Sequence, residues 1–293
     1  MFGMAFGVAV IATRLMGYKQ YGHRMDCATH SIPMNRGYPD AAWRDPGEVL
    51  ALVDTPHRVF QRGTWPGSVS LRRGWARAEA RPWNDTVDDA SLRVIRGGGG
   101  FIGACVEKLS LAGAPSVLST PLSRSARKPW EAAGFSDYID LALMRLGLES
   151  SVPAPQHLVV REDDLDLDAM LEIDKVAFPA FWRFDRLAII ESTRATPKSS
   201  VFVIKDGDLG IAGFAIVGYG HAISYLQRVA VHPNWQGNGM GRSLVRAASR
   251  SARRHGSRAI LLNTQFDNTS AIGLYEAEGY VQLPESLAVL KSG

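Results

Sequence analysis

The sequence predicts an α/β protein built from two similar domains, each a mixed sheet flanked by helices. Short β-branched runs alternate with longer helical patterns along most of the chain. The segment 120–135 aligns with 264–280 with one gap, so a unit of about 145 residues repeats once. Between the copies, the stretch 150–156 (Ser-Ser-Val-Pro-Ala-Pro-Gln) has the composition of a domain linker.

Composition narrows the class of protein. The chain has 293 residues, enough for two domains with cores of their own, and 46% hydrophobic and 21% charged residues are ordinary for a globular protein. The net charge is +4 without a clustered Lys/Arg run, so we expect no nucleic-acid partner. Its two cysteines, Cys27 and Cys105, have no metal or redox spacing, which favours a cytoplasmic protein without a metal cofactor.

Residues 1–47 are expected to form a poorly structured leader. Met1–Thr13 is apolar, but no basic residues precede it and it is shorter than a membrane span. We therefore expect neither a secretory signal nor a membrane partner. Further methionines follow, so translation could start downstream of Met1.

Residues 48–149 are predicted to form the first domain. Its expected elements are a strand at 56–61, helices at 68–80 and 101–111, a strand at 116–119, a helix at 123–133 and a strand at 138–144. In the helix at 68–80, Val69, Trp75 and Ala76 are expected to point inward.

Residues 157–293 are predicted to form the second domain, where the pattern is clearer. Strands are expected at 157–161, 200–204, 211–217, 222–231, 260–264 and 280–283, with more strand after Pro284. Helices are expected at 165–177, 183–193, 240–255 and 268–277, and Gly256 and Gly279 are expected to cap the last two.

The most specific motif lies in Tyr225–Gly241, where a strand leads through Gln236-Gly-Asn-Gly-Met-Gly241 into a helix. Glycines let backbone N–H groups point into one concavity, and a helix N-terminus favours an anion, so this loop suits a pyrophosphate. The spacing is neither the dinucleotide fingerprint nor the P-loop. An ordinary strand-to-helix turn would give the same pattern, so the motif alone leaves both interpretations open.

The spacing Gln-x-x-Gly-x-Gly resembles the acetyl-CoA pyrophosphate loop of the GNAT (Gcn5-related) N-acetyltransferase superfamily. The order of elements in 157–293 is similar to the GNAT fold. The run from Asn268 to Tyr275 resembles the family's Asn-x-x-Ala-x-x-x-Tyr signature, especially in the ribosomal-protein N-terminal alanine acetyltransferase group. The resemblance implies two tandem GNAT-like mixed-sheet domains and acetyl transfer from acetyl-CoA to a primary amine, on a protein N-terminus or a small molecule.

The resemblance also implies roles for individual residues. Main-chain groups of the strand before the loop would bind the pantetheine arm and hold the oxyanion, and Tyr275 would protonate the departing thiolate. The expected cofactor-binding residues are Val229, Ala230, Val231, Gln236, Gly237, Asn238, Gly239, Met240, Gly241, Arg242 and Asn268.

The general base stays open. The alanine acetyltransferase group has a glutamate at the position of Asn263, and an amide cannot accept a proton at neutral pH. His221, Tyr225 and His232 are candidates, each of which could equally be structural.

An aromatic segment lies between the first two helices of the second domain. Phe181, Trp182 and Phe184, with Asp185, could form the acceptor wall and would suit an amine with an apolar flank, although core packing explains the aromatics as well.

The first domain is predicted to be a degenerate copy. Counting back without gaps from Gly113 and Gly256 places Arg93–Gly98 over Gln236–Gly241, so Arg96 takes the position of the first signature glycine. Such a domain would pack against, shape or cover the acceptor site, whereas a register shift would leave Gly97–Gly100 able to bind an anion.

Two other functions fit the sequence. One is that of mycothiol synthase, also a tandem GNAT protein with one active half, which acts on a small cysteinyl glycoside. The other is a non-catalytic acetyl-CoA-binding sensor, which the missing glutamate permits.

Overall fold

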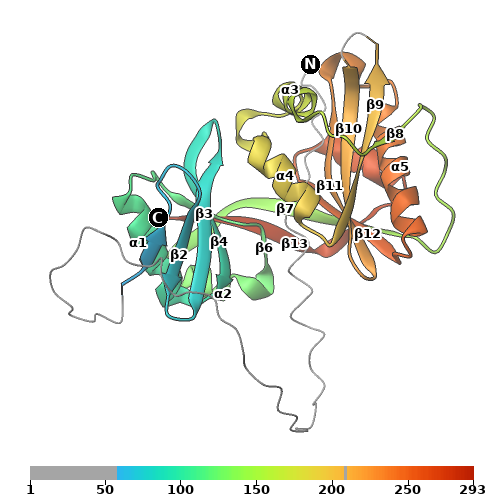
Figure 1. Ribbon diagram of the computed structural model, residues 1–293. Helices are drawn as coiled ribbons and strands as arrows, with labels where there is room; N and C mark the ends of the chain where they lie inside the picture. The colour runs from blue at the N-terminus through green and yellow to red at the C-terminus, as the bar shows by residue number, and fades with distance from the viewer. Residues whose placement is uncertain (1–57, 208–209) are drawn as a thin grey trace, which may run out of the picture.

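A computed structural model describes residues 58–207 and 210–293, so the expected leader lies outside the described residues. The first half contains β1 (Phe60–Arg62), β2 (Val69–Arg73), β3 (Ala76–Asn84), β4 (Val87–Arg96), α1 (Gly99–Leu111), β5 (Val117–Ser119), β6 (Leu122–Ser123), η1 (Arg124–Ala126), α2 (Lys128–Glu131) and β7 (Phe135–Gly147). The second half contains β8 (Val160–Glu162), α3 (Leu167–Ala177), η2 (Ala180–Trp182), α4 (Arg186–Arg194), β9 (Lys198–Asp206), β10 (Gly210–Tyr219), β11 (Ile223–Val231), η3 (Pro233–Trp235), α5 (Met240–Arg254), β12 (Ala259–Gln265), α6 (Thr269–Ala277) and β13 (Val281–Ser292). The mixed α/β class is confirmed (Figure 1).

Within the described residues, one thirteen-stranded sheet runs through both halves in the order β1-β2-β3-β4-β5-β13-β7-β12-β11-β10-β9-β8, and β6 pairs with β13. Each half contains one parallel pair, β4 with β5 and β11 with β12, and the other neighbouring strands are antiparallel. None of the helices within 58–207 and 210–293 is long and apolar enough to cross a membrane.

The last strand of each half pairs with the other half. β7 pairs with β12 over 141–147, and β13 pairs with β5 at Lys291. β7 and β13 also pair with each other, and they run side by side between the halves in Figure 1. The linker at 150–156 therefore separates two stretches of sequence but does not separate two sheets.

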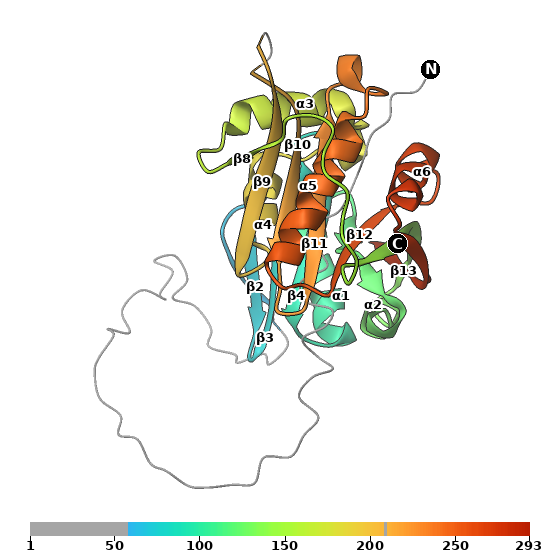
Figure 2. The same ribbon diagram turned by 90° about the vertical axis from the view of Figure 1, so that its right-hand side faces the viewer.

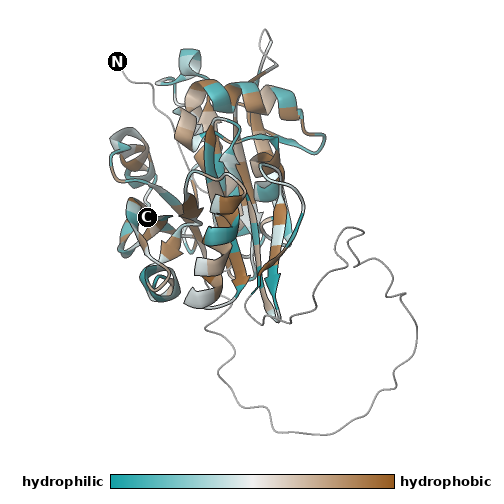
Figure 3. Cartoon of the chain, turned by 90° about the vertical axis from the view of Figure 1, so that its left-hand side faces the viewer, coloured by the Kyte–Doolittle hydropathy of each residue, from teal (hydrophilic) through white to brown (hydrophobic). Residues whose placement is uncertain are grey.

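Helices cover both faces of the sheet in the second half. Alternate residues of a strand point to opposite faces, and in β10 Phe214 and Ile216 pack against α3 and α4 whereas Ala215 and Val217 pack against α5. Figure 2 shows α5 in front of the strands, and Figure 3 shows the strands as largely hydrophobic between the helices. Between these two faces the sheet has a gap, because β11 and β12 pair only at their first residues.

The expected helix at 68–80 is wrong, because this segment forms β2 and β3. The alanines and charged residues of this stretch are good helix formers, yet Ala76, Ala78 and Ala80 alternate with polar residues and are buried on one face of β3. Trp75 lies in the turn between the strands and is 69% exposed, so it does not point inward. The helix expected at 123–133 is reduced to η1 and α2.

Elements of the second half are confirmed to within three residues at their starts. Gly256 and Gly279 follow α5 and α6 with φ angles of 81° and 84°, as expected of C-terminal glycine caps.

Candidate functional site

The sheet has a gap between β11 and β12. These parallel strands pair only between 223–225 and 259–261, so among the described residues the rest of β11, up to Val231, has no strand partner on this side. The other edge of β11 pairs with β10 as far as Val231. Unpaired backbone groups of an edge can bind an extended ligand as an added strand, so β11 offers a binding edge directly before the glycine loop.

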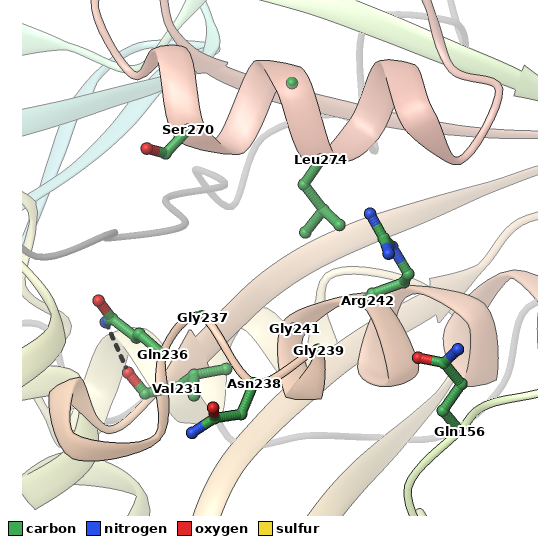
Figure 4. A pocket seen from close by; sticks show the side chains of 11 residues that line it. Gln156, Val231, Gln236, Gly237, Asn238, Gly239, Gly241, Arg242, Ser270 and Leu274 are labelled. Atoms are coloured by element: carbon green, nitrogen blue, oxygen red, sulfur yellow. Dashed lines mark hydrogen bonds between the residues drawn. The ribbon is translucent and has the colours of Figure 1, made fainter.

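The glycine loop forms the floor of a pocket of about 470 Å³ at the end of this gap (Figure 4). Gln236 Nε2 donates to the carbonyl oxygen of Val231 over 2.9 Å, which ties the start of the loop to the end of β11. The lining residues are Gln156, Val231, Gln236, Gly237, Asn238, Gly239, Gly241, Arg242, Ser270, Gly273 and Leu274. The structure thus brings together seven of the predicted cofactor residues.

Two glycines of the loop have the left-handed backbone that other residues rarely adopt. Gly237 and Gly239 both have φ of 81°, and Gly239 is the N-cap of α5. As a glycine, Gly239 has no side chain that could cap this end of the helix, and the first turn of α5 contains no acidic residue. Its first N–H groups are therefore suited to an anionic ligand.

Arg242 brings a positive charge to the pocket. Its Nε atom lies 3.0 Å from a carboxylate oxygen of Glu278, a nearly buried residue that also binds Arg246. The Arg242 side chain is 41% exposed. The ion pair fixes the guanidinium beside the pocket while part of it faces solvent.

Residues that follow the linker brace the loop. The Ser243 hydroxyl of α5 accepts from the backbone N–H groups of Gln156 and His157, each over 3.1 Å. His157 Nε2 lies 2.7 Å from the Asn238 carbonyl oxygen. Arg246 and Arg250 donate to linker carbonyls, so these two arginines are not the solvated helix face that a run of charges usually forms.

α6 covers the pocket with one face and the core with another. Ser270, Gly273 and Leu274 line the pocket, as residues three and four apart on a helix share a face, whereas Ala271 and Tyr275 are fully buried. Asn268 is the N-cap of α6, where its side chain accepts from the Ala271 N–H over 3.2 Å. Ser270, Gly273 and Leu274 were not predicted from the sequence, although their helical spacing within the signature was a usable signal.

Tyr275 is directed into the core behind the gap. Its ring lies 5.6 Å from that of Tyr280, and burial raises the pKa of its hydroxyl whereas the nearby Arg228 charge lowers it. Arg228 lies on β11 at the unpaired part of the strand. The hydroxyl is therefore protonated at neutral pH and lies near the gap, but Tyr275 does not line the pocket.

A buried ion pair lies on the opposite face of β11. Arg228, 1% exposed, donates from Nε and an Nη atom to the two carboxylate oxygens of Asp174 over 2.7 and 2.8 Å. Its guanidinium lies between the rings of Phe178 and Phe184, 3.5 and 3.8 Å from their centroids. Part of the predicted acceptor wall therefore stacks on an arginine that the sequence analysis missed.

The predicted general-base candidates lie at different places. His221 lies in the turn before β11, at the opposite end of that strand from the glycine loop. Burial raises the pKa of Tyr225, which keeps its phenol protonated and unsuited to accept a proton. His232 accepts from the Asn234 N–H as a cap of η3. Asn263 is buried on β12, in register with Leu143 of β7.

The remaining predicted cofactor residues lie around the pocket without lining it. Val229 and Ala230 are buried on β11 with their side chains in opposite cores, and Met240 starts α5 beside the loop. The predicted contacts of Val229 and Ala230 involve main-chain groups, so they do not require these side chains to line the pocket.

The corresponding loop of the first half differs from that of the second half. α1 begins after its N-cap Gly98, so Gly98 corresponds to Gly239 and the ungapped alignment that placed Arg96 there is wrong by two residues. Arg96 is the last residue of β4. A Cβ atom at Gly99 would lie 2.9 Å from the Pro129 carbonyl oxygen of α2. The short α2 thus packs against the first turn of α1.

Among residues 58–207 and 210–293 there is no group of three or more His, Cys, Asp or Glu side chains that could hold a metal ion.

Comparisons with known proteins agree with this geometry. Residues 167–280 match the Acetyltransferase (GNAT) family. Mycothiol acetyltransferase of Corynebacterium glutamicum (strain R) is 27% identical over 99 residues, which are 34% of this chain and 34% of that protein. The alignment therefore spans about a third of that relative.

Two solved structures share the fold across both halves. A tandem GNAT protein from the clavulanic acid biosynthesis pathway is 16% identical, with a TM-score of 0.52 over 77% of this chain and 82% of that chain. N-myristoyltransferase of Saccharomyces cerevisiae is 10% identical, with a TM-score of 0.53 over 77% of this chain and 69% of that chain. At these identities the likeness concerns the fold alone.

Proposed function

We propose that the chain transfers an acetyl group from acetyl-CoA to a primary amine, because residues 167–280 match the Acetyltransferase (GNAT) family. The observation that carries the proposal is the continuity of the pocket on the glycine loop with the unpaired edge of β11. The pocket on the glycine loop suits a pyrophosphate, and the unpaired edge of β11 suits an extended arm that contains amides. Together they fit the two chemically different parts of acetyl-CoA.

The residues around the gap supply the functions that acetyl transfer needs. Bound acetyl-CoA would supply an acyl group activated as a thioester. N–H groups of Gly237–Gly241 and the Arg242 guanidinium would bind its phosphates. A main-chain N–H of Val229–Val231 would hold the thioester oxygen as negative charge develops, and the Tyr275 hydroxyl would protonate the departing thiolate.

Attack by the amine requires a neutral nitrogen, and we assign no side chain as its base. With Asn263 in the strand and Tyr225 held protonated by burial, proton loss from the amine would proceed through solvent. We expect turnover to rise with pH until the amine itself is deprotonated.

A cytoplasmic location stays a prediction from the cysteine content.

A panel of acceptors tests the proposed function. The purified chain is incubated with acetyl-CoA and peptides with free N-termini, small aliphatic and aromatic amines, or a cysteinyl glycoside, and thiol release is measured. We expect release that depends on at least one acceptor. Binding of acetyl-CoA without acceptor-dependent release from any of them would instead indicate a sensor.

The cysteinyl glycoside represents a second candidate function, favoured by the partial similarity to mycothiol acetyltransferase. Turnover restricted to that acceptor would select this function over acetylation of peptides. Mass spectrometry of the product would show whether the nitrogen carries the acetyl group.

A further inference from the structure

The loop between α3 and α4 lies on the face of the sheet opposite the glycine-loop pocket. Its neighbours α3 and α4 pack against one side of β10 and β11, and α5 packs against the other. The gap between β11 and β12 connects these faces, because the pairing of these two strands ends at Tyr225 and Leu261. An acceptor that approached the gap from the face opposite the pocket would meet the side of the sheet on which this loop lies.

The second half holds the loop from beneath. Arg228 donates to the carbonyl oxygen of Trp182 over 2.8 Å, and Asp174 accepts from the Phe184 N–H over 2.7 Å. These contacts fix the loop to β11 and α3. Neither of them comes from the first half.

The first half holds the same loop from above through the β3–β4 hairpin. Asn84, 2% exposed, donates from Nδ2 to the carbonyl oxygens of Ala180 and Arg183 over 2.9 and 3.1 Å. Thr86 orients this amide by donating to Asn84 Oδ1 over 2.9 Å, and its hydroxyl also lies 3.1 Å from the Ala180 oxygen. Trp83 Nε1 donates to the carbonyl oxygen of Phe181 over 2.6 Å. Three backbone carbonyls of the loop thus accept hydrogen bonds from residues about 95 positions earlier in the chain.

Aromatic and charged contacts strengthen this attachment. The Trp83 ring stacks on Phe181 at 4.9 Å, and Tyr138 of β7 meets Phe181 edge-on at 5.9 Å. Arg81 pairs with Asp185 over 2.8 Å, and Asp185 also caps α4 by accepting from the Ala188 N–H. The Asp185 carboxylate is therefore engaged in structure, which leaves the aromatic rings as the part of the loop that can face an acceptor.

We propose that the β3–β4 hairpin of the first half sets the acceptor affinity of the second by holding the loop 178–185. This inference rests on the proposed function and assigns the first half a role that does not depend on its own glycine loop. Asn84 is a positioning residue in this view. The rings of Phe181, Trp83 and Tyr138 favour an acceptor with an apolar or aromatic group beside its amine.

Two variants test the inference in the full chain with the best acceptor of the panel. Asn84→Ala removes the amide contacts to the carbonyl oxygens of Ala180, Phe181 and Arg183. Thr86→Val removes the hydroxyl that donates to the amide oxygen while keeping the side-chain volume. We expect the KM for the acceptor to rise by about fivefold or more in Asn84→Ala and by a smaller factor in Thr86→Val. The KM for acetyl-CoA should change by less than about twofold, because the loop lies on the other face.

Arg77→Ala is the matched control, since Arg77 lies on the same strand and its side chain pairs with Glu79 within the first half. Amide hydrogen exchange provides a second readout that needs no turnover. In Asn84→Ala, residues 178–185 should exchange faster, with 236–242 unchanged.

The outcomes separate the two proposals. Turnover by the unmodified chain together with an unchanged acceptor KM in Asn84→Ala, or an equal rise in both KM values, would overturn the role of the hairpin. An unchanged exchange rate at 178–185 would overturn it as well. No turnover with any acceptor would refute the proposed function itself, and with it the link to acceptor affinity.

Discussion

Replacing Tyr275 by Phe is expected to lower kcat by about 100-fold or more, the range for loss of a general acid. Burial raises the pKa of the Tyr275 hydroxyl, so the proton that a thiolate needs is present throughout the neutral range. The side chain does not line the pocket at the glycine loop, so the affinity for acetyl-CoA should change little. The measurement is thiol release under saturating substrates, together with a binding titration.

Tyr280→Phe is a close control for this variant. Tyr280 is also a buried tyrosine, its ring is 5.6 Å from Tyr275, and its hydroxyl bonds to Ser249 over 3.0 Å. Both substitutions remove one buried hydroxyl from the same core. Equal kcat values for the two variants would show that Tyr275 has only a packing role.

Removing Arg228 is expected to have the largest effect on stability. In Arg228→Ala, Asp174 is left as a buried carboxylate without its bidentate partner, and the stacking on Phe178 and Phe184 is lost. Breaking a buried pair in this way costs about 3–5 kcal/mol of unfolding free energy. Equilibrium denaturation followed by tryptophan fluorescence measures this loss.

Two further variants identify the cause. Arg228→Met combined with Asp174→Leu replaces both charges with apolar groups and should be less destabilised than Arg228→Ala, because no charge remains buried alone. Arg161→Ala breaks an ion pair with Asp163 whose side chains are 59% and 78% exposed, and should cost less than about 1 kcal/mol. If Arg228→Ala lost as little unfolding free energy as Arg161→Ala, this result would contradict the importance of the buried pair.

The second half was largely predictable because its local signals agree. The glycine loop, the long helix after it and the caps at Gly256 and Gly279 all specify the same strand and helix boundaries. The first half was less predictable because local propensity opposes the fold. Residues 68–80 contain helix-favouring alanines and arginines, yet they form two strands whose alternating alanines pack beneath α1.

Long-range features left no local signal. The pairing of β13 with β5 joins residues about 170 positions apart, and the contact of Asn84 with the loop after α3 joins residues about 100 positions apart. The two-residue error at Arg96 has a simpler cause, since α1 has 13 residues and α5 has 15, so counting back from their ends misplaces the start. Asn268, which begins the Asn-x-x-Ala-x-x-x-Tyr signature, is the N-cap of α6, so helix capping alone accounts for an asparagine at this position.

The central claim, that the second-half glycine loop binds acetyl-CoA, is tested most directly by calorimetric titration of the chain with this ligand. Gly239→Val forces a β-branched residue into φ of 81° beside the pocket, and Gly256→Val introduces the same residue at the same φ at the other end of α5, in open space. We predict one site per chain, weakened about tenfold or more by Gly239→Val and little changed by Gly256→Val. Two sites per chain, or equal affinity in the two variants, would contradict the account.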